Sequence, residues 1–261
     1  MKITISHNIG EVQIALNKAG KQARYAGSQA LNDTAFKVRE AVQKEMDTKF
    51  DRVTPYIRRS VFVKQSTPAT LTATIEPRYM GGKGVDPQKV LQAEVYGGAR
   101  RQKASEKAMH RVGILPSGYS MVPGQQCPLD AYGNIKGSFL VQLISYFQAF
   151  GEQGYKANMT DKRKAALAKH GRTAKGYKTI NGVVYFVAYG RLRGGRTSHL
   201  APGIWSKTGI HGVDVKPIIM FVRDGNYKTK LDFYGVASRT VDATFQTAFD
   251  ARFNAAMRTA R

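Results

Sequence analysis

The chain has 261 residues and is strongly basic, with 41 Lys and Arg against 18 Asp and Glu, a formal net charge of +23 and a pI near 10.2. Such a charge attracts polyanions, and it does not by itself choose between nucleic acid and acidic proteins. A hydrophobic share of 42%, including 10% aromatic residues, is enough for a packed core and excludes a disordered basic tail.

One cysteine, Cys127, excludes an internal disulfide. The N-terminal residues 1–7 lack the apolar run of a signal peptide, and no later segment approaches the roughly 18 apolar residues of a membrane span. We therefore expect a protein that is made and assembled in a reducing cytoplasm and does not contact membranes.

The first predicted elements are a short strand and a long helix. Ile3 and Ile5 alternate with polar residues, which favours a strand, and Asn8 precedes Glu11 by three residues, as in a capping box. Apolar residues then recur at helical spacing as far as Phe50. Two glycines weaken the first half, and we expect a bend or a helix boundary near Gly27. The stripe of small, mostly alanine residues on this helix faces either its own domain or a partner.

Shorter elements follow Pro55, which stops the helix. Residues 60–64 and 71–75 have the composition of two strands, and 88–96 forms a further short element. A brief helix is predicted for 106–112.

Chain breakers fill residues 113–135, which predicts a long functional loop within a loop-rich region spanning 97–137. Four apolar side chains in this loop are candidate anchors for neighbouring subunits: Tyr119, Met121, Leu129 and Tyr132. An apolar helix is expected from about Ser138 to Phe150.

A basic insertion is predicted at about 154–178, where eight Lys or Arg occur between Lys156 and Lys178. Beyond it, Asn181-Gly182 is a strong signal for a two-residue hairpin turn. A second hairpin is expected to pair 215–222 with 227–234 across Asp224-Gly225.

The last predicted element is a helix from about Ser238 with an aromatic stripe of Phe245, Phe249 and Phe253. The order of elements predicts a single α+β domain over residues 1–261. In it, an antiparallel sheet is covered on one face by helices, including a long N-terminal and a C-terminal one.

Residues for catalysis are not arranged in any recognisable motif. Cys127 lies in a turn beside Pro128, away from the start of a helix that would lower its pKa. Acidic residues are too sparse for a two-metal nuclease. The five histidines are scattered along the chain and do not suggest a metal site: His7, His110, His170, His199 and His211. We expect neither an enzyme nor a bound cofactor or metal.

Three basic clusters are the candidate contacts for a partner or for DNA. Each consists of closely spaced Lys and Arg, although such a cluster can also be an ordinary solvated face. Their residues are Arg100, Arg101 and Lys103; Lys162, Arg163, Lys164, Lys169 and Arg172; and Arg191, Arg193 and Arg196.

Three blocks of sequence carry a resemblance to a known family. They are Tyr96 to Phe150, His199-Leu-Ala-Pro-Gly-Ile-Trp205 and Lys216-Pro-Ile-Ile-Met-Phe-Val222. In their order, over most of residues 10–257, the chain resembles the tail-completion or minor tail protein Z type of tailed bacteriophages.

That resemblance implies a non-enzymatic virion protein of the head–tail junction or tail, built as a ring around the DNA path. The implied partners are other copies of the chain, connector, portal or tail proteins, and genomic DNA in the channel. The alternative hypothesis is a basic nucleic-acid-binding protein that organises or packages DNA.

Overall fold

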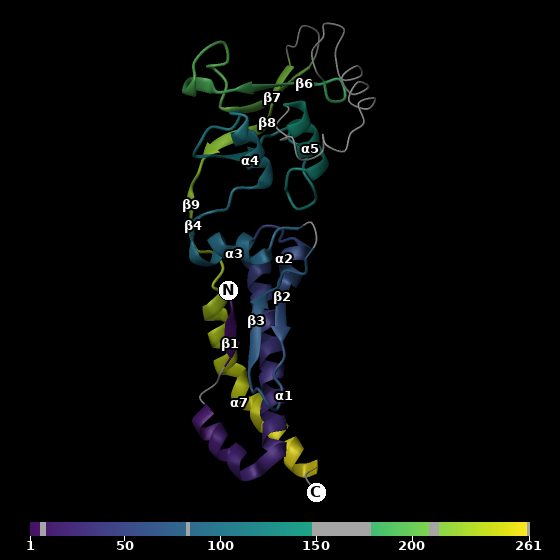
Figure 1. Ribbon diagram of the computed structural model, residues 1–261, viewed down its shortest axis with the longest axis vertical. Coiled ribbons are helices and arrows are strands. Elements are labelled where there is room, and N and C mark those ends of the chain that lie inside the picture. Colours follow the sequence, from purple (N-terminus) through teal and green to yellow (C-terminus); the bar gives the residue numbers. More distant parts are fainter. Residues whose placement is uncertain (6–8, 82–83, 148–178, 209–213, 260–261) are drawn as a thin grey trace. The chain divides into compact units, whose positions relative to one another are not determined.

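The computed structural model describes residues 1–5, 9–81, 84–147, 179–208 and 214–259 (Figure 1). They form an α+β protein in which antiparallel sheets pack against helices. The predicted fold class is confirmed, including the long helices near both ends of the chain. The basic insertion predicted at 154–178 lies outside the described residues.

The chain divides into two compact units. Unit 1 comprises Met1–Arg101 and Asn226–Arg261, and unit 2 comprises Gln102–Gly225. Each has its own cluster of buried apolar side chains. The chain leaves unit 1 after β4 (Gly98–Ala99) and returns at β9 (Asn226–Tyr227), and these two short strands pair with each other. Because that exit and return lack the composition of a linker, the sequence did not reveal the division.

Unit 1 is built on two long helices, α1 (Ile9–Lys49) and α7 (Phe233–Thr259), which run side by side in Figure 1. The break in α1 lies at Gly20, whose φ of 69° and ψ of −143° are not helical, and not near Gly27 as predicted. Gly27 lies within the helix, where a side chain would find room. A Cβ there would lie 3.8 Å from side-chain atoms of Leu71 and Phe249.

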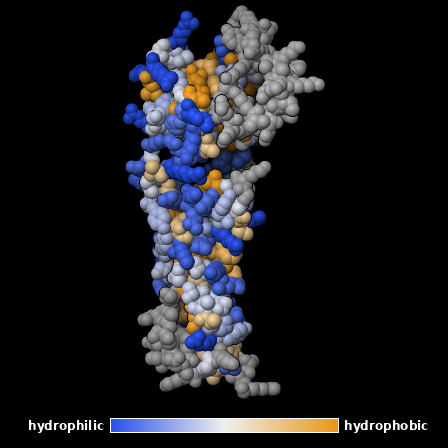
Figure 2. All heavy atoms as spheres, in the orientation of Figure 1, coloured by the Kyte–Doolittle hydropathy of each residue, from blue (hydrophilic) through white to orange (hydrophobic). Residues whose placement is uncertain are grey.

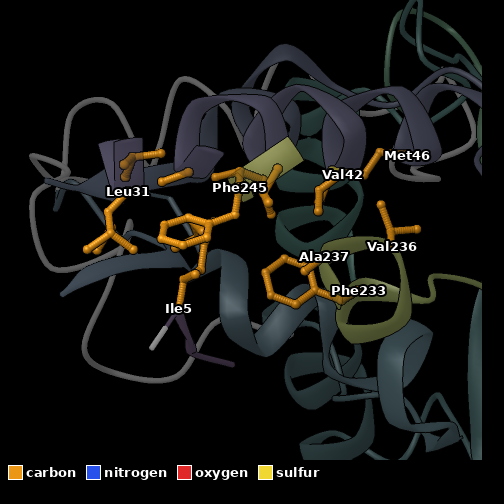
Figure 3. Packing of buried hydrophobic residues seen from close by; sticks show 14 of the residues in the cluster. Ile5, Leu31, Val42, Met46, Phe233, Val236, Ala237 and Phe245 are labelled. Carbon is orange, nitrogen blue, oxygen red and sulfur yellow. The ribbon is translucent and has the colours of Figure 1, made fainter. Parts of the chain in front are cut away.

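The small residues of α1 face the core of unit 1. Their side chains are at most 1% exposed: Ala23, Ala26, Ala30 and Ala35. Figure 3 shows Leu31 of α1 beside Phe245 of α7 and Ile5, with Val42 and Met46 opposite Val236. The stripe therefore packs within its own unit, where small side chains let the helices approach closely.

A three-stranded antiparallel sheet completes this core. It consists of β1 (Ile3–Ile5), β2 (Val61–Lys64) and β3 (Ala73–Pro77) in the order β1-β3-β2, which confirms the three strands predicted here. Alternate residues of β2 are buried and exposed, so the helices cover one face of the sheet. Two short helices also belong to unit 1, and each has a capping side chain at its N-terminus: α2 (Pro55–Ser60) and α3 (Pro87–Tyr96).

Unit 2 contains a four-stranded antiparallel sheet with the order β5-β8-β7-β6. The strands are β5 (Tyr119–Pro123), β6 (Val184–Ala188), β7 (Gly203–Thr208) and β8 (Asp214–Arg223). Side chains of α4 (Ala104–Arg111) and α5 (Gly137–Tyr146) pack against it, with Met109 and Leu143 fully buried.

Two predictions in this region were wrong. Strand β5 lies inside the predicted loop 113–135, because its partner β8 is about a hundred residues away and gives no local signal. The hairpin of 215–222 with 227–234 does not form, since β8 pairs with β5 and β7 while α7 begins at Phe233. Asp232 starts that helix by accepting a hydrogen bond from Gly235 N (3.0 Å).

The predicted Asn181-Gly182 turn is confirmed. Both residues have positive φ, 49° and 78°, and Ile180 exchanges backbone hydrogen bonds with Val183 across them. Positive φ at both central positions is the requirement of a type I′ turn, which explains this residue pair.

Candidate polyanion-binding surface

Helix α4 presents its charged residues on one side. Lys103, Lys107 and Arg111 recur every four residues and are all exposed, whereas Glu106 and Met109 on the other side are fully buried. Glu106 fixes the helix in place. Its carboxylate accepts hydrogen bonds from Lys103 N (2.7 Å) at the start of α4 and from Met121 N (2.9 Å) in β5.

A basic loop between β6 and β7, residues 189–196, is held against the end of α4; we call it the arginine loop. The Tyr189 hydroxyl donates to the Gly113 carbonyl oxygen (3.0 Å), and Arg193 Nη2 donates to the same oxygen (3.4 Å). The Arg193 guanidinium also stacks on the Tyr189 ring, 3.8 Å from its centroid. These contacts bring Arg191 and Arg196 to the end of α4 that carries Arg111.

The first bend of the arginine loop depends on Gly190. Its φ is 56°, and a Cβ there would approach Leu200 O to 2.6 Å, so only glycine fits. Three exposed arginines follow: Arg191, Arg193 and Arg196. Figure 2 shows strongly hydrophilic atoms where Figure 1 draws the green segment that contains this loop.

Acidic side chains in the described part of unit 2 are engaged in local structure. Glu106 is buried, Asp130 accepts from Tyr132 N (2.8 Å) and Asn134 N (2.9 Å), and Ser120 Oγ donates to Asp224. Asp214 pairs with Lys216 (2.9 Å), and the hydrogen bond from Lys216 lowers the pKa of this carboxyl.

The structure brings together only some of the predicted contacts. Lys103 is the N-cap residue of α4 and Arg111 is the last residue of that helix. The arginine loop is hydrogen-bonded to Gly113, just beyond Arg111. Arg100 and Arg101 belong to unit 1, where Arg100 Nη1 donates to Arg101 O (3.2 Å). The third cluster lies outside the described residues: Lys162, Arg163, Lys164, Lys169 and Arg172.

Two residues of this surface were missed from the sequence. Arg111 continues the spacing of Lys103 and Lys107 and could have been found by extending that pattern by one helical turn. Tyr189 carries no charge and gave no signal, because its role depends on a contact with Gly113, 76 residues away.

Groups with nucleophilic or metal-binding chemistry are spread apart. Cys127 is 8% exposed, and burial raises its thiol pKa to about 11, which opposes a thiolate nucleophile. His110 Nδ1 lies 2.8 Å from Leu115 O. Among the described residues, no three His, Cys, Asp or Glu side chains are grouped to hold a metal ion.

The helices within the described ranges are too short or too polar to cross a bilayer. Comparison of the chain with protein-family models, with curated proteins and with solved structures found no match.

Proposed function

We propose that the chain is a non-enzymatic structural subunit of a tailed-phage particle, located at the head–tail junction or in the tail. The supporting observation is that the three blocks of the resemblance contribute to one compact unit. Residues 203–205 lie in β7, Lys216–Val222 lies in β8, and Tyr96–Phe150 supplies α4, β5 and α5. Gly203 is required there, because a Cβ would lie 2.3 Å from Ile219 O on the neighbouring strand.

The subunit contacts of this proposal involve the turn after β5. Leu129 and Tyr132 are 40% and 39% exposed, while Asp130 holds the turn that carries them. Met121, which the sequence suggested as a third anchor, is 3% exposed in the core of unit 2 and is not available to a neighbour. Exposed apolar side chains on an ordered turn are suited to contacts between subunits.

Incorporation into particles tests this function. The coding sequence is supplied in trans to a phage that lacks it, and purified particles are assayed for the chain by mass spectrometry and for infectivity. We expect the wild-type chain to copurify at fixed stoichiometry. Replacing both Leu129 and Tyr132 by Ser should preserve the melting temperature and abolish incorporation. Val141→Ser, which alters a 39% exposed residue of α5, is the matched control. A chain that never copurifies with particles contradicts the proposal.

A second candidate function is nucleic-acid binding outside the particle. The observation that favours it is the exposed cationic surface of α4 and the arginine loop. Phosphate neutralisation makes such binding fall steeply with salt. Tight binding to free duplex by a chain that is absent from particles would favour this second function.

A further inference from the structure

We propose that the arginine loop and the exposed face of α4 bind the phosphate backbone of double-stranded DNA. Arg191, Arg196 and Arg111 are the phosphate contacts, and Tyr189 and Arg193 hold the loop in its binding conformation. The inference rests on the proposed function and deepens it, because it names the partner that this surface meets in the particle.

The arginine loop is ordered before any ligand binds. Its start is fixed by Gly190 against Leu200 O and by the Tyr189 hydroxyl on Gly113 O. Its end is fixed by two backbone hydrogen bonds, Ser198 N to Gly195 O (3.1 Å) and Leu200 N to Thr197 O (3.0 Å). A loop that is already in place loses less conformational entropy on binding, which raises affinity without any new contact.

Arg193 is oriented differently from the other two arginines. Its planar face lies on the Tyr189 ring and its Nη2 donates to Gly113 O, so it ties the loop to the end of α4. The stacking on Tyr189 and the hydrogen bond to Gly113 O make Arg193 a positioning residue. Arg191 and Arg196 flank it on the exposed part of the loop.

The end of α4 does not repel an anion as a bare helix C-terminus would. Ile114 N and Leu115 N donate to Met109 O (3.0 and 3.2 Å), and Gly113 N donates to His110 O (2.9 Å). Gly113 O accepts from Tyr189 and Arg193. The carbonyl oxygens of Met109, His110 and Gly113 therefore all have hydrogen-bond donors, which weakens their repulsion of an anion near the arginine loop.

The same contacts favour duplex phosphates over unpaired bases. Single strands are held by stacking on open aromatic faces, and Arg193 covers one face of Tyr189. A protein partner is disfavoured as well, since the centres of protein interfaces are depleted of charge. On the arginine loop, three exposed arginines surround a single exposed apolar side chain, Leu192.

The contact residues are tested by the salt dependence of affinity. Fluorescence anisotropy of the full chain with a labelled 30-base-pair duplex is measured between roughly 50 and 300 mM salt. Each lost phosphate contact should reduce the slope of log K against log salt by about 0.9. We expect that reduction for Arg191→Gln and for Arg196→Gln. Lys207→Gln, an exposed cation in β7 (Gly203–Thr208), is the control and should change the slope little. Unchanged slopes in both arginine variants overturn the inference.

The positioning residues are tested by a variant that removes no charge. Tyr189→Leu releases the loop but keeps every cation, so affinity should fall roughly tenfold at all salt concentrations while the slope stays constant. Tyr189→Phe removes only the hydroxyl bond to Gly113 and should have a smaller effect. A constant melting temperature, followed through Trp205 fluorescence, separates this result from misfolding. A Tyr189→Leu chain that binds the duplex like wild type refutes the positioning role.

The remaining outcome identifies a different partner. If Arg191→Gln with Arg196→Gln leaves duplex binding intact but prevents incorporation into particles, the surface meets an acidic virion protein. That result overturns the DNA assignment and leaves the proposed function standing. If the double variant binds duplex more weakly and the wild-type chain never enters particles, the DNA assignment stands and the proposed function is overturned.

Discussion

The best-defined arginine contacts of the two units differ. In unit 1, Arg252 forms a two-pronged ion pair with Asp33 (2.6 and 2.9 Å), and Arg239 pairs with Asp232 (3.0 Å). In unit 2, Arg193 instead contacts a tyrosine ring and a backbone carbonyl. Unit 1 has 23 Lys and Arg against 12 Asp and Glu, and unit 2 has 18 against 6, which together account for the 41 and 18 of the whole chain.

The difference shows that net charge says little about where a basic protein is basic. Carboxylates of unit 1 face arginines across the surface, so much of its charge is compensated locally. In unit 2, Asp214 pairs with Lys216, whereas Glu106 and Asp224 accept hydrogen bonds from a backbone N–H group and a hydroxyl. Unit 2 also presents exposed arginines on the arginine loop, where a polyanion could contact them.

The largest loss of stability is expected from a substitution in the core of unit 1. Phe245 is 3% exposed in the core of unit 1, and Phe245→Ala should destabilise that unit by about 3–5 kcal/mol. The only tryptophan, Trp205, lies in unit 2 and reports its unfolding alone. In urea, the far-UV circular dichroism of α1 and α7 should shift to lower denaturant while Trp205 fluorescence does not. Equal shifts of both probes would mean that the units unfold together.

A smaller loss of folding stability is expected from replacing Glu106. Glu106→Ala leaves the buried Met121 N–H without its acceptor, which costs about 1–3 kcal/mol. Here the Trp205 transition should move and the circular dichroism of the long helices should not. Glu106→Gln keeps one acceptor oxygen and is the control, with a milder loss. A variant of full stability would show that the carboxylate is dispensable to unit 2.

The ion pair of unit 1 should matter less than the buried carboxylate of unit 2. Asp33 and Arg252 have side chains that are 35% and 47% exposed, so solvent screens their attraction. Asp33→Asn should cost about 0.2–1 kcal/mol, and less in high salt. A loss above 2 kcal/mol that persists in 1 M salt would contradict surface compensation as the role of this pair.

The smallest effect is expected at Cys127, whose thiol belongs to unit 2. Burial raises its pKa to about 11, above the ordinary value of 9.0, so the folded state favours the neutral thiol. The stabilisation is complete below pH 9 and is lost as the pH rises toward 11. A disulfide reagent at pH 8 should react slowly with the native chain and also with Phe245→Ala, but rapidly in urea. Fast labelling of the native chain would place the thiol outside the core.

Local patterns were enough to predict many elements of this chain. Period-2 alternation located β1 to β3, and the aromatic stripe of α7 correctly placed Phe245 and Phe249 in a core. The errors arose where a segment's partner is distant. Residues 227–234 alternate like a strand, yet Leu231 and Phe233 are buried in the core of unit 1 at the start of α7.

The candidate site was half visible in the sequence. Runs of Lys and Arg are apparent without any structure, and they included Lys103 and the arginine loop. The attachment of that loop to α4 was not apparent, because it depends on a hydroxyl and a guanidinium meeting one carbonyl of Gly113. Neutral residues with such roles leave no trace in composition or charge.

The pairing of β4 with β9 makes unit 2 a transplantable cassette. Gly98 lies opposite Tyr227 and Ala99 opposite Asn226, so the two ends of the segment 100–225 emerge from adjacent strands. A two-residue turn such as Asn-Gly could bridge those strands if the segment were removed. Recombination could likewise exchange the coding segment for another while every element of unit 1 keeps its partners. Such an exchange would change the surface that unit 2 presents without redesigning the helices and sheet of unit 1.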